Sequence, residues 1–211
     1  MLLHSIHEFG HLKLPFFGMN KGTVGFMLNS FEDDGLIQRV EKAKPSTMIP
    51  LRMRVTDIKG EKHEAIAFNE VSMIRHSGQS ANLKVSVDKQ VRIPKLMCDG
   101  ILVSTPAGST AYNLSAHGPI VPMGANVLAM TPVSPFRPRR WKGALLPYTS
   151  KIDIENLDPE KRPVGVSADS HEVQDAALVE IWEDESAAVN VLFDAGYSLQ
   201  DRIFNEQFQS G

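Results

Sequence analysis

The sequence predicts a mixed α/β (α+β) chain in which a short helical segment precedes a longer β-rich region. Three observations support this prediction. Apolar residues recur at helical spacing before residue 45, and they alternate with polar residues from about residue 50. The composition, with 42% hydrophobic and 22% charged residues in a chain of 211, is that of an ordinary globular protein. A chain of this length can hold one large domain or two small ones.

The first segment is expected to contain two helices. One covers residues 1–9 and is followed by a turn-rich stretch. The other covers about residues 32–43, with Ser30 and Asp33 forming a capping box at its start. Its apolar face at helical spacing consists of Leu36, Ile37 and Val40.

Strands are expected wherever apolar and polar residues alternate, because successive side chains of a strand point to opposite faces. The alternation is clearest at residues 51–55 and 83–87. Further strands are predicted near residues 152–154, 178–182 and 189–193. The region after the first segment is therefore β-rich.

A domain boundary is predicted at residues 42–46, where the period, the charge and a proline all change together. The expected organisation is a first domain over residues 1–45 and a β-rich domain over residues 46–195. Residues 196–211 are expected to form a C-terminal helix that returns to the first domain.

Charge and cysteine content exclude several classes of protein. The formal net charge of −3 provides no global basic field for nucleic acid or an anionic membrane. The basic run at residues 137–142, which includes Trp141, is interpreted as a loop near phosphates, a subunit contact or a solvated turn. No apolar run reaches the length of a membrane span, and the lone Cys98 forms no intrachain disulfide. We expect a cytoplasmic protein with neither a nucleic-acid nor a membrane partner.

One short motif suggests a zinc metallopeptidase. The sequence from His7 through Glu8 to His11 matches H-E-x-x-H, in which two histidines one helical turn apart bind zinc and the glutamate acts as general base. Gly10 lies inside the motif, and Pro15 ends any helix soon after it. Histidines on an exposed helix end are therefore the preferred interpretation, and the peptidase is a remote alternative.

The longest chemical signal is the segment DGILVSTPAGSTAYNLSAHGP, which covers residues 99–119. It runs from an apolar strand through a turn rich in Gly, Ser and Thr into a short helix. Small residues let a ligand approach the backbone, and the N–H groups at a helix start can bind its polar groups. Tyr112 offers a flat ring for a base. The layout indicates a ligand site, and an ordinary strand–turn–helix connection is the alternative.

Four segments together closely resemble the NAD kinase family, which phosphorylates the 2′-hydroxyl of the adenosine ribose of NAD to give NADP. They are residues 18–26, 69–71, 99–119 and 167–169, and the third matches the family's dinucleotide-site signature. The resemblance implies the remnant of a Rossmann-like nucleotide-binding domain followed by a β-sandwich-like C-terminal domain. It also implies ATP or polyphosphate as phosphoryl donor, Mg²⁺ as cofactor, and a homodimer or homotetramer.

The resemblance also implies a set of dinucleotide-binding residues. Asn69 and Glu70 would contact the dinucleotide, and Asp99 would bind a ribose or the nicotinamide end. Thr131 would line the pocket and Asp169 would lie at its edge. The residues that would surround the adenine end are Thr110, Ala111, Tyr112 and Ser115.

One family feature has no counterpart in this sequence. Family members carry a Gly-Gly-Asp-Gly loop whose glycines hold the phosphates and whose aspartate acts on the reacting hydroxyl, and residues 1–4 resemble those that directly follow that loop. We therefore expect the catalytic aspartate to lie upstream of Met1, and neither a catalytic residue nor a metal ligand within the chain. A non-catalytic protein that binds NAD or NADP is the alternative function.

Overall fold

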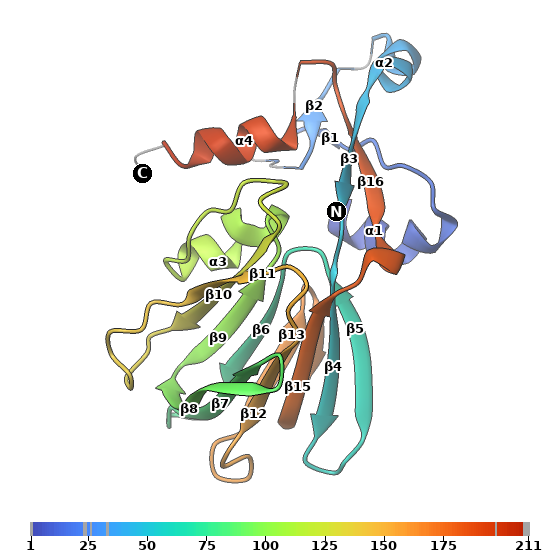
Figure 1. Cartoon of the computed structure of the whole chain (residues 1–211). Coiled ribbons are helices and arrows are strands. Elements are labelled where there is room, and N and C mark those ends of the chain that lie inside the picture. Colours follow the sequence, from blue (N-terminus) through green and yellow to red (C-terminus); the bar gives the residue numbers. More distant parts are fainter. Residues whose placement is uncertain (1, 23–24, 26, 33, 197, 209–211) are drawn as a thin grey trace. The chain divides into compact units, whose positions relative to one another are not determined.

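The computed structural model describes residues 2–22, 25, 27–32, 34–196 and 198–208. The chain forms two compact units, of which unit 1 comprises residues 1–49 and 185–211 and unit 2 comprises residues 50–184 (Figure 1). Among the described residues, the helices are all too short to cross a membrane.

Unit 1 contains the helices and two small sheets. The helices are α1 (Leu2–Phe9), α2 (Leu36–Lys42) and α4 (Leu199–Glu206), with 3₁₀ turns at Gly10–Leu12 and Glu185–Ala187. Strands β1 (Met19–Asn20) and β2 (Asn29–Ser30) pair in parallel, and β3 (Lys44–Met48) pairs antiparallel with β16 (Val189–Phe193). Its buried side chains include Ile6, Phe193, Leu199 and Ile203.

The helices of unit 1 follow the predicted pattern, and α2 is shorter than predicted. Helix α2 begins after Gly35, whose φ of 69° is left-handed, and no side chain caps its start. Asp33, the predicted partner of Ser30 in a capping box, lies outside the described residues. Helix α4 does have a side-chain cap, because Ser198 Oγ accepts the Asp201 N–H at 2.9 Å.

Unit 2 is built from two six-stranded antiparallel sheets, and 3₁₀ turn Ala107–Thr110 and helix α3 (Tyr112–Ser115) follow one strand of the first. The first sheet has the order β11-β10-β9-β6-β13-β14 and the second β5-β4-β15-β12-β7-β8. The first sheet consists of β6 (Glu70–Arg75), β9 (Gly100–Ser104), β10 (Val127–Val133), β11 (Ala144–Pro147), β13 (Val164–Ala168) and β14 (His171–Val173). The second consists of β4 (Leu51–Asp57), β5 (Lys62–Ala67), β7 (Ala81–Val87), β8 (Gln90–Cys98), β12 (Ile152–Asn156) and β15 (Ala176–Glu183).

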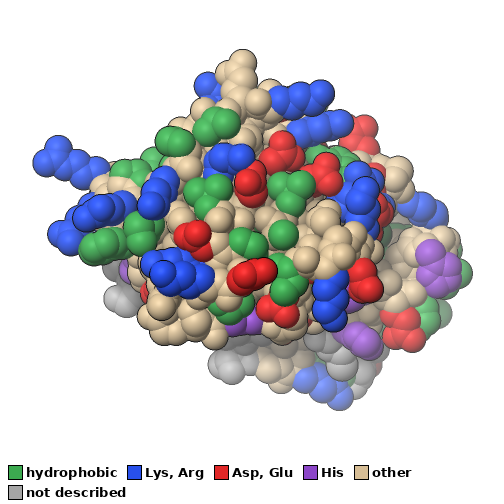
Figure 2. Space-filling view, turned by 90° about the horizontal axis from the view of Figure 1, so that it is seen from below, with side chains coloured by type: hydrophobic (Ala, Val, Ile, Leu, Met, Phe, Trp, Pro, Cys, Tyr) green, Lys and Arg blue, Asp and Glu red, His purple; other side chains and the backbone are tan. Residues whose placement is uncertain are grey.

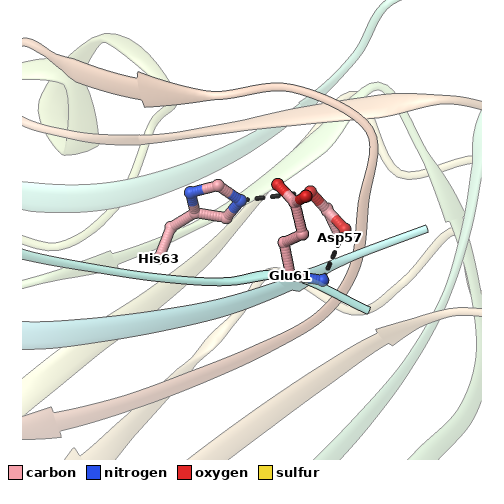
Figure 3. A group of neighbouring side chains, drawn as sticks. All are labelled: Asp57, Glu61 and His63. Atoms are coloured by element: carbon pink, nitrogen blue, oxygen red, sulfur yellow. Dashed lines mark hydrogen bonds and ion pairs between the residues drawn. The ribbon is translucent and has the colours of Figure 1, made fainter. Parts of the chain in front are cut away.

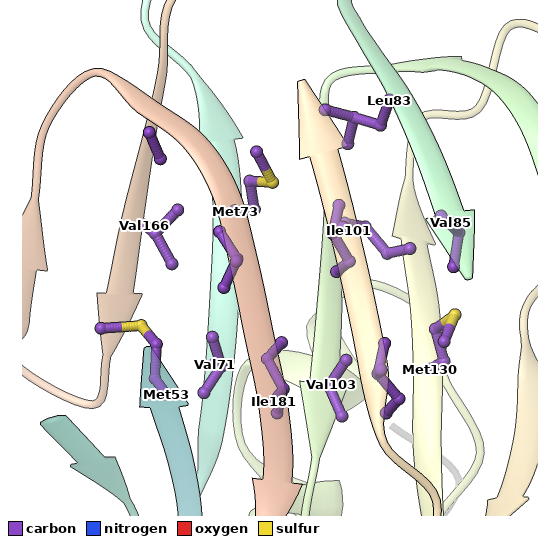
Figure 4. Close-up of a cluster of buried hydrophobic side chains, with 14 of the residues drawn as sticks. Met53, Val71, Met73, Leu83, Val85, Ile101, Val103, Met130, Val166 and Ile181 are labelled. Carbon is purple, nitrogen blue, oxygen red and sulfur yellow. The ribbon is translucent and has the colours of Figure 1, made fainter. Parts of the chain in front are cut away.

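The two sheets of unit 2 enclose one apolar core (Figure 4). Strand β4 shows why they do so: Leu51, Met53 and Val55 are fully buried, whereas the alternating arginines stay partly exposed. Each fully buried side chain of this size contributes about 1.5–3 kcal/mol relative to its exposed state. The predicted alternation and the β-sandwich-like architecture are therefore confirmed. Cys98 is packed in the same core, and burial raises the pKa of its thiol to about 12.

The boundaries of the two units differ from those inferred from sequence. The segment 189–193 was assigned to the β-rich domain because it alternates, but β16 pairs with β3 and belongs to unit 1. Alternation identifies a strand without identifying its partner, since pairing is decided by contacts that are distant in sequence. Unit 2 accordingly ends at residue 184.

Candidate functional site

Three of the predicted binding segments meet at one end of the first sheet. Strand β6 is antiparallel to both β9 and β13, so its first residue lies beside their last ones. Glu70 pairs with Ser104 at the end of β9, and Val71 pairs with Ala168 at the end of β13. Three features therefore lie together at this end of the sheet. They are Asn69, Asp169 and the turn that follows Ser104.

The peptide backbone of Phe68 and Asn69 is held from both sides. The two carboxylate oxygens of Asp169 accept the Phe68 N–H at 2.8 Å and the Asn69 N–H at 2.9 Å. Thr105 donates its hydroxyl to the Phe68 carbonyl at 2.7 Å and its N–H to the Asn69 carbonyl at 3.0 Å. These four bonds fix the residues that lead into Glu70. Asp169 was predicted to lie at the pocket edge, and the structure shows its carboxylate positioning the Phe68–Asn69 backbone.

A glycine is required where the 107–110 turn crosses Asn69. A Cβ atom built on Gly108 would lie 2.1 Å from the Asn69 carbonyl oxygen, which is far inside van der Waals contact. From the sequence, the small residues of this turn were expected to let a ligand approach the backbone. At Gly108 the structure shows instead that the missing side chain admits the protein's own backbone.

A buried asparagine, whose role the sequence did not indicate, supports helix α3. Asn113 is fully buried, and its amide donates to the carbonyls of Ser109 at 3.0 Å and Pro119 at 2.9 Å. Thr131 donates its hydroxyl to Asn113 Oδ1 at 2.7 Å. Thr131 was predicted to line the pocket, but it is only 1% exposed, so the structure places it behind α3 as a support. The only sequence signal for this network was a polar residue within a Gly- and Pro-rich connection.

The polar groups of the site that point outward lie on two segments. Tyr112 is 40% exposed and Ser115 is also exposed, whereas Thr110 and Ala111 are partly exposed. Asn69 is partly buried, and its side-chain amide makes no hydrogen bond to any other residue that the structure describes. The α3 segment and Asn69 thus provide an aromatic ring, hydroxyls and an amide on one surface.

Glu70 is the most unusual group at this end of the sheet. Its Oε2 atom is buried and has no hydrogen-bond partner within the described part of the chain. Burial and the charge of Asp169 raise the pKa of Glu70 to about 7, although the Tyr112 N–H opposes the shift by hydrogen bonding to the carboxylate. A buried acceptor without a partner is costly, so this oxygen is suited to accept hydroxyl groups of a ligand.

Within one chain, Asp99 lies far from the other residues predicted to bind the dinucleotide. It precedes β9, whereas the Asn69–Glu70 pair lies beside the far end of that strand. The four residue steps from Gly100 to Ser104 span roughly 13 Å. The Asp99 carboxylate instead accepts a hydrogen bond from Arg75 Nε at 2.5 Å, at the opposite end of the sheet.

The histidines of the H-E-x-x-H match do not form a zinc-binding helix. Helix α1 ends at Phe9, and His11 lies in the following 3₁₀ turn, where its Nδ1 is 3.0 Å from the Glu8 carbonyl oxygen. Because a zincin needs both histidines on successive turns of one helix, this geometry argues against the peptidase alternative.

The one group of potential metal ligands found among the described residues is Asp57, Glu61 and His63 (Figure 3). It closes the turn between β4 and β5. One oxygen of Asp57 accepts the N–H groups of Lys59 at 2.8 Å and Glu61 at 3.0 Å, and the other lies 3.1 Å from His63 Nε2. The hydrogen bond with His63 holds the pKa of Asp57 below its usual value. These contacts describe a hydrogen-bonded turn. It lies at the end of β4 that is far from Phe68.

Comparison with known protein families gives one clear match. Residues 68–190 match the model of the ATP-NAD kinase C-terminal domain. The chain is 55% identical over 194 residues to an NAD kinase of Hyphomonas neptunium, covering 92% of this chain and 76% of that protein. It is 49% identical over 209 residues to an NAD kinase of Caulobacter vibrioides, covering 99% of this chain and 80% of that one.

Solved structures with the same fold include a yeast NADH kinase complexed with NADH. The TM-score is 0.83 at 26% identity, and the match covers 99% of this chain and 63% of the yeast chain. An NAD kinase from Archaeoglobus fulgidus in complex with ATP matches with a TM-score of 0.74 at 23% identity, covering 93% of this chain and 75% of that one. At 23% identity, the match to the Archaeoglobus fulgidus structure shows a shared fold alone.

Proposed function

The chain belongs to the NAD kinase family of phosphotransferases, and on this premise we propose that the Asn69–Glu70–Tyr112 end of unit 2 binds the NAD whose 2′-hydroxyl is phosphorylated. The buried and unpartnered carboxylate oxygen of Glu70 carries this proposal. Ribose hydroxyls are hydrogen-bond donors of the kind that it lacks. The names of the relatives favour the kinase over the non-catalytic alternative.

Each exposed group of the site has a matching group on the dinucleotide. The Asn69 amide can donate to and accept from the edge of adenine, because it carries both kinds of atom. The exposed Tyr112 ring can cover a flat base. The hydroxyls of Thr110 and Ser115 add polar contacts on the same surface. Asp169 and Thr105 hold the backbone beneath these groups.

The phosphoryl donor is proposed to be ATP, with polyphosphate as the alternative, and Mg²⁺ as the accompanying cation. No group of three metal-ligating side chains is present at this end of the sheet in the part of the chain that the structure describes. The residues described above bind and orient the acceptor, which is the main requirement of a phosphoryl transfer. The cytoplasm is the proposed compartment, and the buried free thiol of Cys98 is compatible with its reducing conditions.

The position of Asp99 leads to a proposal about assembly. If Asp99 binds a ribose, as the family resemblance implies, it binds a dinucleotide that a second copy of the chain holds, since its own sheet separates it from Glu70. A two-fold symmetric dimer would pair each Asp99 with the site of the other subunit. We therefore propose a homodimer, or a homotetramer that contains such dimers.

Substitution of Tyr112 tests the location of the site. We expect Tyr112→Ala to weaken binding of NAD by about tenfold or more in a calorimetric titration, because stacking on an aromatic ring contributes about 1–3 kcal/mol per base. Tyr148→Ala is the matched control, since Tyr148 is only partly exposed and lies outside the site, in the turn after β11. Equal affinities of the two variants would locate the dinucleotide elsewhere.

A complementation experiment tests the proposed contribution of Asp99. Tyr112→Ala and Asp99→Asn are each expected to bind NAD weakly when alone. When the two variants are unfolded together and refolded, mixed dimers should restore roughly a quarter of the strong sites, because half of the dimers then contain one intact site. If mixing restores no strong sites, Asp99 does not act on a neighbouring copy.

A further inference from the structure

A second concave surface of unit 2 lies between the edges of the two sheets, and it shares no residue with the proposed dinucleotide site. Its volume is about 1070 Å³, which is ample for a small organic ligand. We call it the edge groove. Its floor is formed by core side chains, and its walls are formed by partly buried ones. The floor includes Val85, Val87 and Met130, and the walls include Ile93, Trp141 and Leu146.

Backbone hydrogen bonds between β8 and the segment that follows β10 lie beside the edge groove. Met97 lies on β8, the edge strand of the second sheet, and the segment 136–138 follows β10 of the first sheet. The Met97 N–H donates to the Arg137 carbonyl at 2.8 Å, and the Phe136 N–H donates to the Met97 carbonyl at 2.7 Å. This side of the edge groove is therefore part of the folded framework of unit 2.

The rim of the edge groove is cationic. Arg92, Lys95 and Arg137 line it and are exposed, and none forms an ion pair with an acidic side chain of the described residues. Asp88 is the one acid of the lining, and its oxygens accept from the Lys151 N–H at 2.9 Å and the Ser150 hydroxyl at 3.4 Å. Figure 2 shows Lys and Arg side chains beside hydrophobic ones along one margin of unit 2.

We propose that the edge groove binds a single-chain amphipathic carboxylate, with its hydrocarbon tail against Ile93, Trp141 and Leu146 and its carboxylate at the cationic rim. The apolar side chains of the walls match the tail, since contact with them removes hydrocarbon from water. The Arg and Lys side chains without acidic partners can bind the carboxylate head group of the ligand, because charge-assisted hydrogen bonds to a carboxylate are strong. A neutral apolar ligand would leave the three cations unused.

Trp141 provides a direct probe of this proposal. The chain has two tryptophans, and Trp182 stacks with Arg54 on a different strand, so Trp182→Phe leaves Trp141 as the only indole. In that background we expect dodecanoate, added below its micelle concentration, to shift the Trp141 emission to shorter wavelength in a saturable manner. Dodecanol and dodecyltrimethylammonium should bind about tenfold more weakly, because neither carries a negative charge.

Two variants and a control distinguish the groove from other surfaces. Ala144→Phe fills the groove from its partly exposed wall and should abolish the shift. Arg92→Glu combined with Arg137→Glu should weaken binding of dodecanoate by about tenfold. Lys59→Glu, which changes the charge of an exposed turn outside the groove, should have no effect.

Three results would overturn the proposal. The first is a shift that persists in Ala144→Phe, and the second is equal binding of dodecanoate and dodecyltrimethylammonium. The third is a Trp141 emission that depends on protein concentration and does not respond to dodecanoate, which would show that a second copy of the chain covers the groove. Circular dichroism of each variant establishes that it is folded.

Discussion

Gly108→Ala is expected to lower the free energy of unfolding of unit 2 by about 3 kcal/mol or more, because overpacking against backbone is poorly relieved. The added Cβ would lie 2.1 Å from the Asn69 carbonyl oxygen and 2.4 Å from the Asn69 Cα. Either the 107–110 turn or the Phe68–Asn69 backbone must move. Because both belong to the proposed site, binding of NAD should be lost together with the stability. Urea denaturation and calorimetric titration measure the two effects.

Gly78→Ala is the matched control for this substitution. Gly78 also lies in a connection of unit 2, but its Cβ would have no neighbour within 4 Å. A new methyl group there should leave both stability and binding unchanged. A Gly108→Ala variant as stable as Gly78→Ala would contradict the close packing of the turn on Asn69.

Asp169→Ala is expected to have the second largest effect. It removes the carboxylate that accepts the N–H groups of Phe68 and Asn69, and each such bond to a charged group contributes about 1.5–3 kcal/mol. We therefore expect the free energy of unfolding to fall by about 3 kcal/mol. The pKa of Glu70 should also fall, since the charge of Asp169 is one cause of its elevation. Urea denaturation and the pH dependence of NAD binding report these changes separately.

Asp175→Ala provides a matched control for the backbone conformation. Asp169 has a φ of 50° and Asp175 a φ of 52°, so both substitutions place alanine in the same left-handed conformation. Asp175 is exposed, and its side chain makes no hydrogen bond to another residue that the structure describes. Equal losses of stability in the two variants would show that backbone strain, and not the carboxylate of Asp169, accounts for the effect.

The sequence predicted the parts of the structure that depend on local pattern. The alternation of Leu51, Met53 and Val55 indicated a half-buried strand, and the structure buries these three residues. The helical pattern before residue 45 likewise yielded α1 and α2. These features are set by side-chain periodicity within a few residues, so one sequence is sufficient to identify them.

The features that the sequence did not predict depend on contacts between distant residues. The hydroxyl of Thr131 binds Asn113, and the absent side chain of Gly108 admits Asn69, but neither contact has a local pattern. The location of Asp99 at the far end of its sheet follows from the antiparallel pairing of β6 and β9. Register of this kind is decided by the whole sheet and by its core.

The most direct test of the proposed site is the proton release that accompanies binding of NAD near pH 7. The pKa of Glu70 is raised to about 7, so the carboxyl is half protonated there, and ribose hydroxyls that donate to the carboxylate lower this pKa. Calorimetric titration in buffers of different ionisation enthalpy should show the release of about half a proton per NAD, and the affinity should rise with pH through about 7. Glu70→Gln should abolish the release and weaken binding. Unchanged affinity in Glu70→Gln, with no proton exchange in the wild type, would contradict the assignment of Glu70 to the dinucleotide.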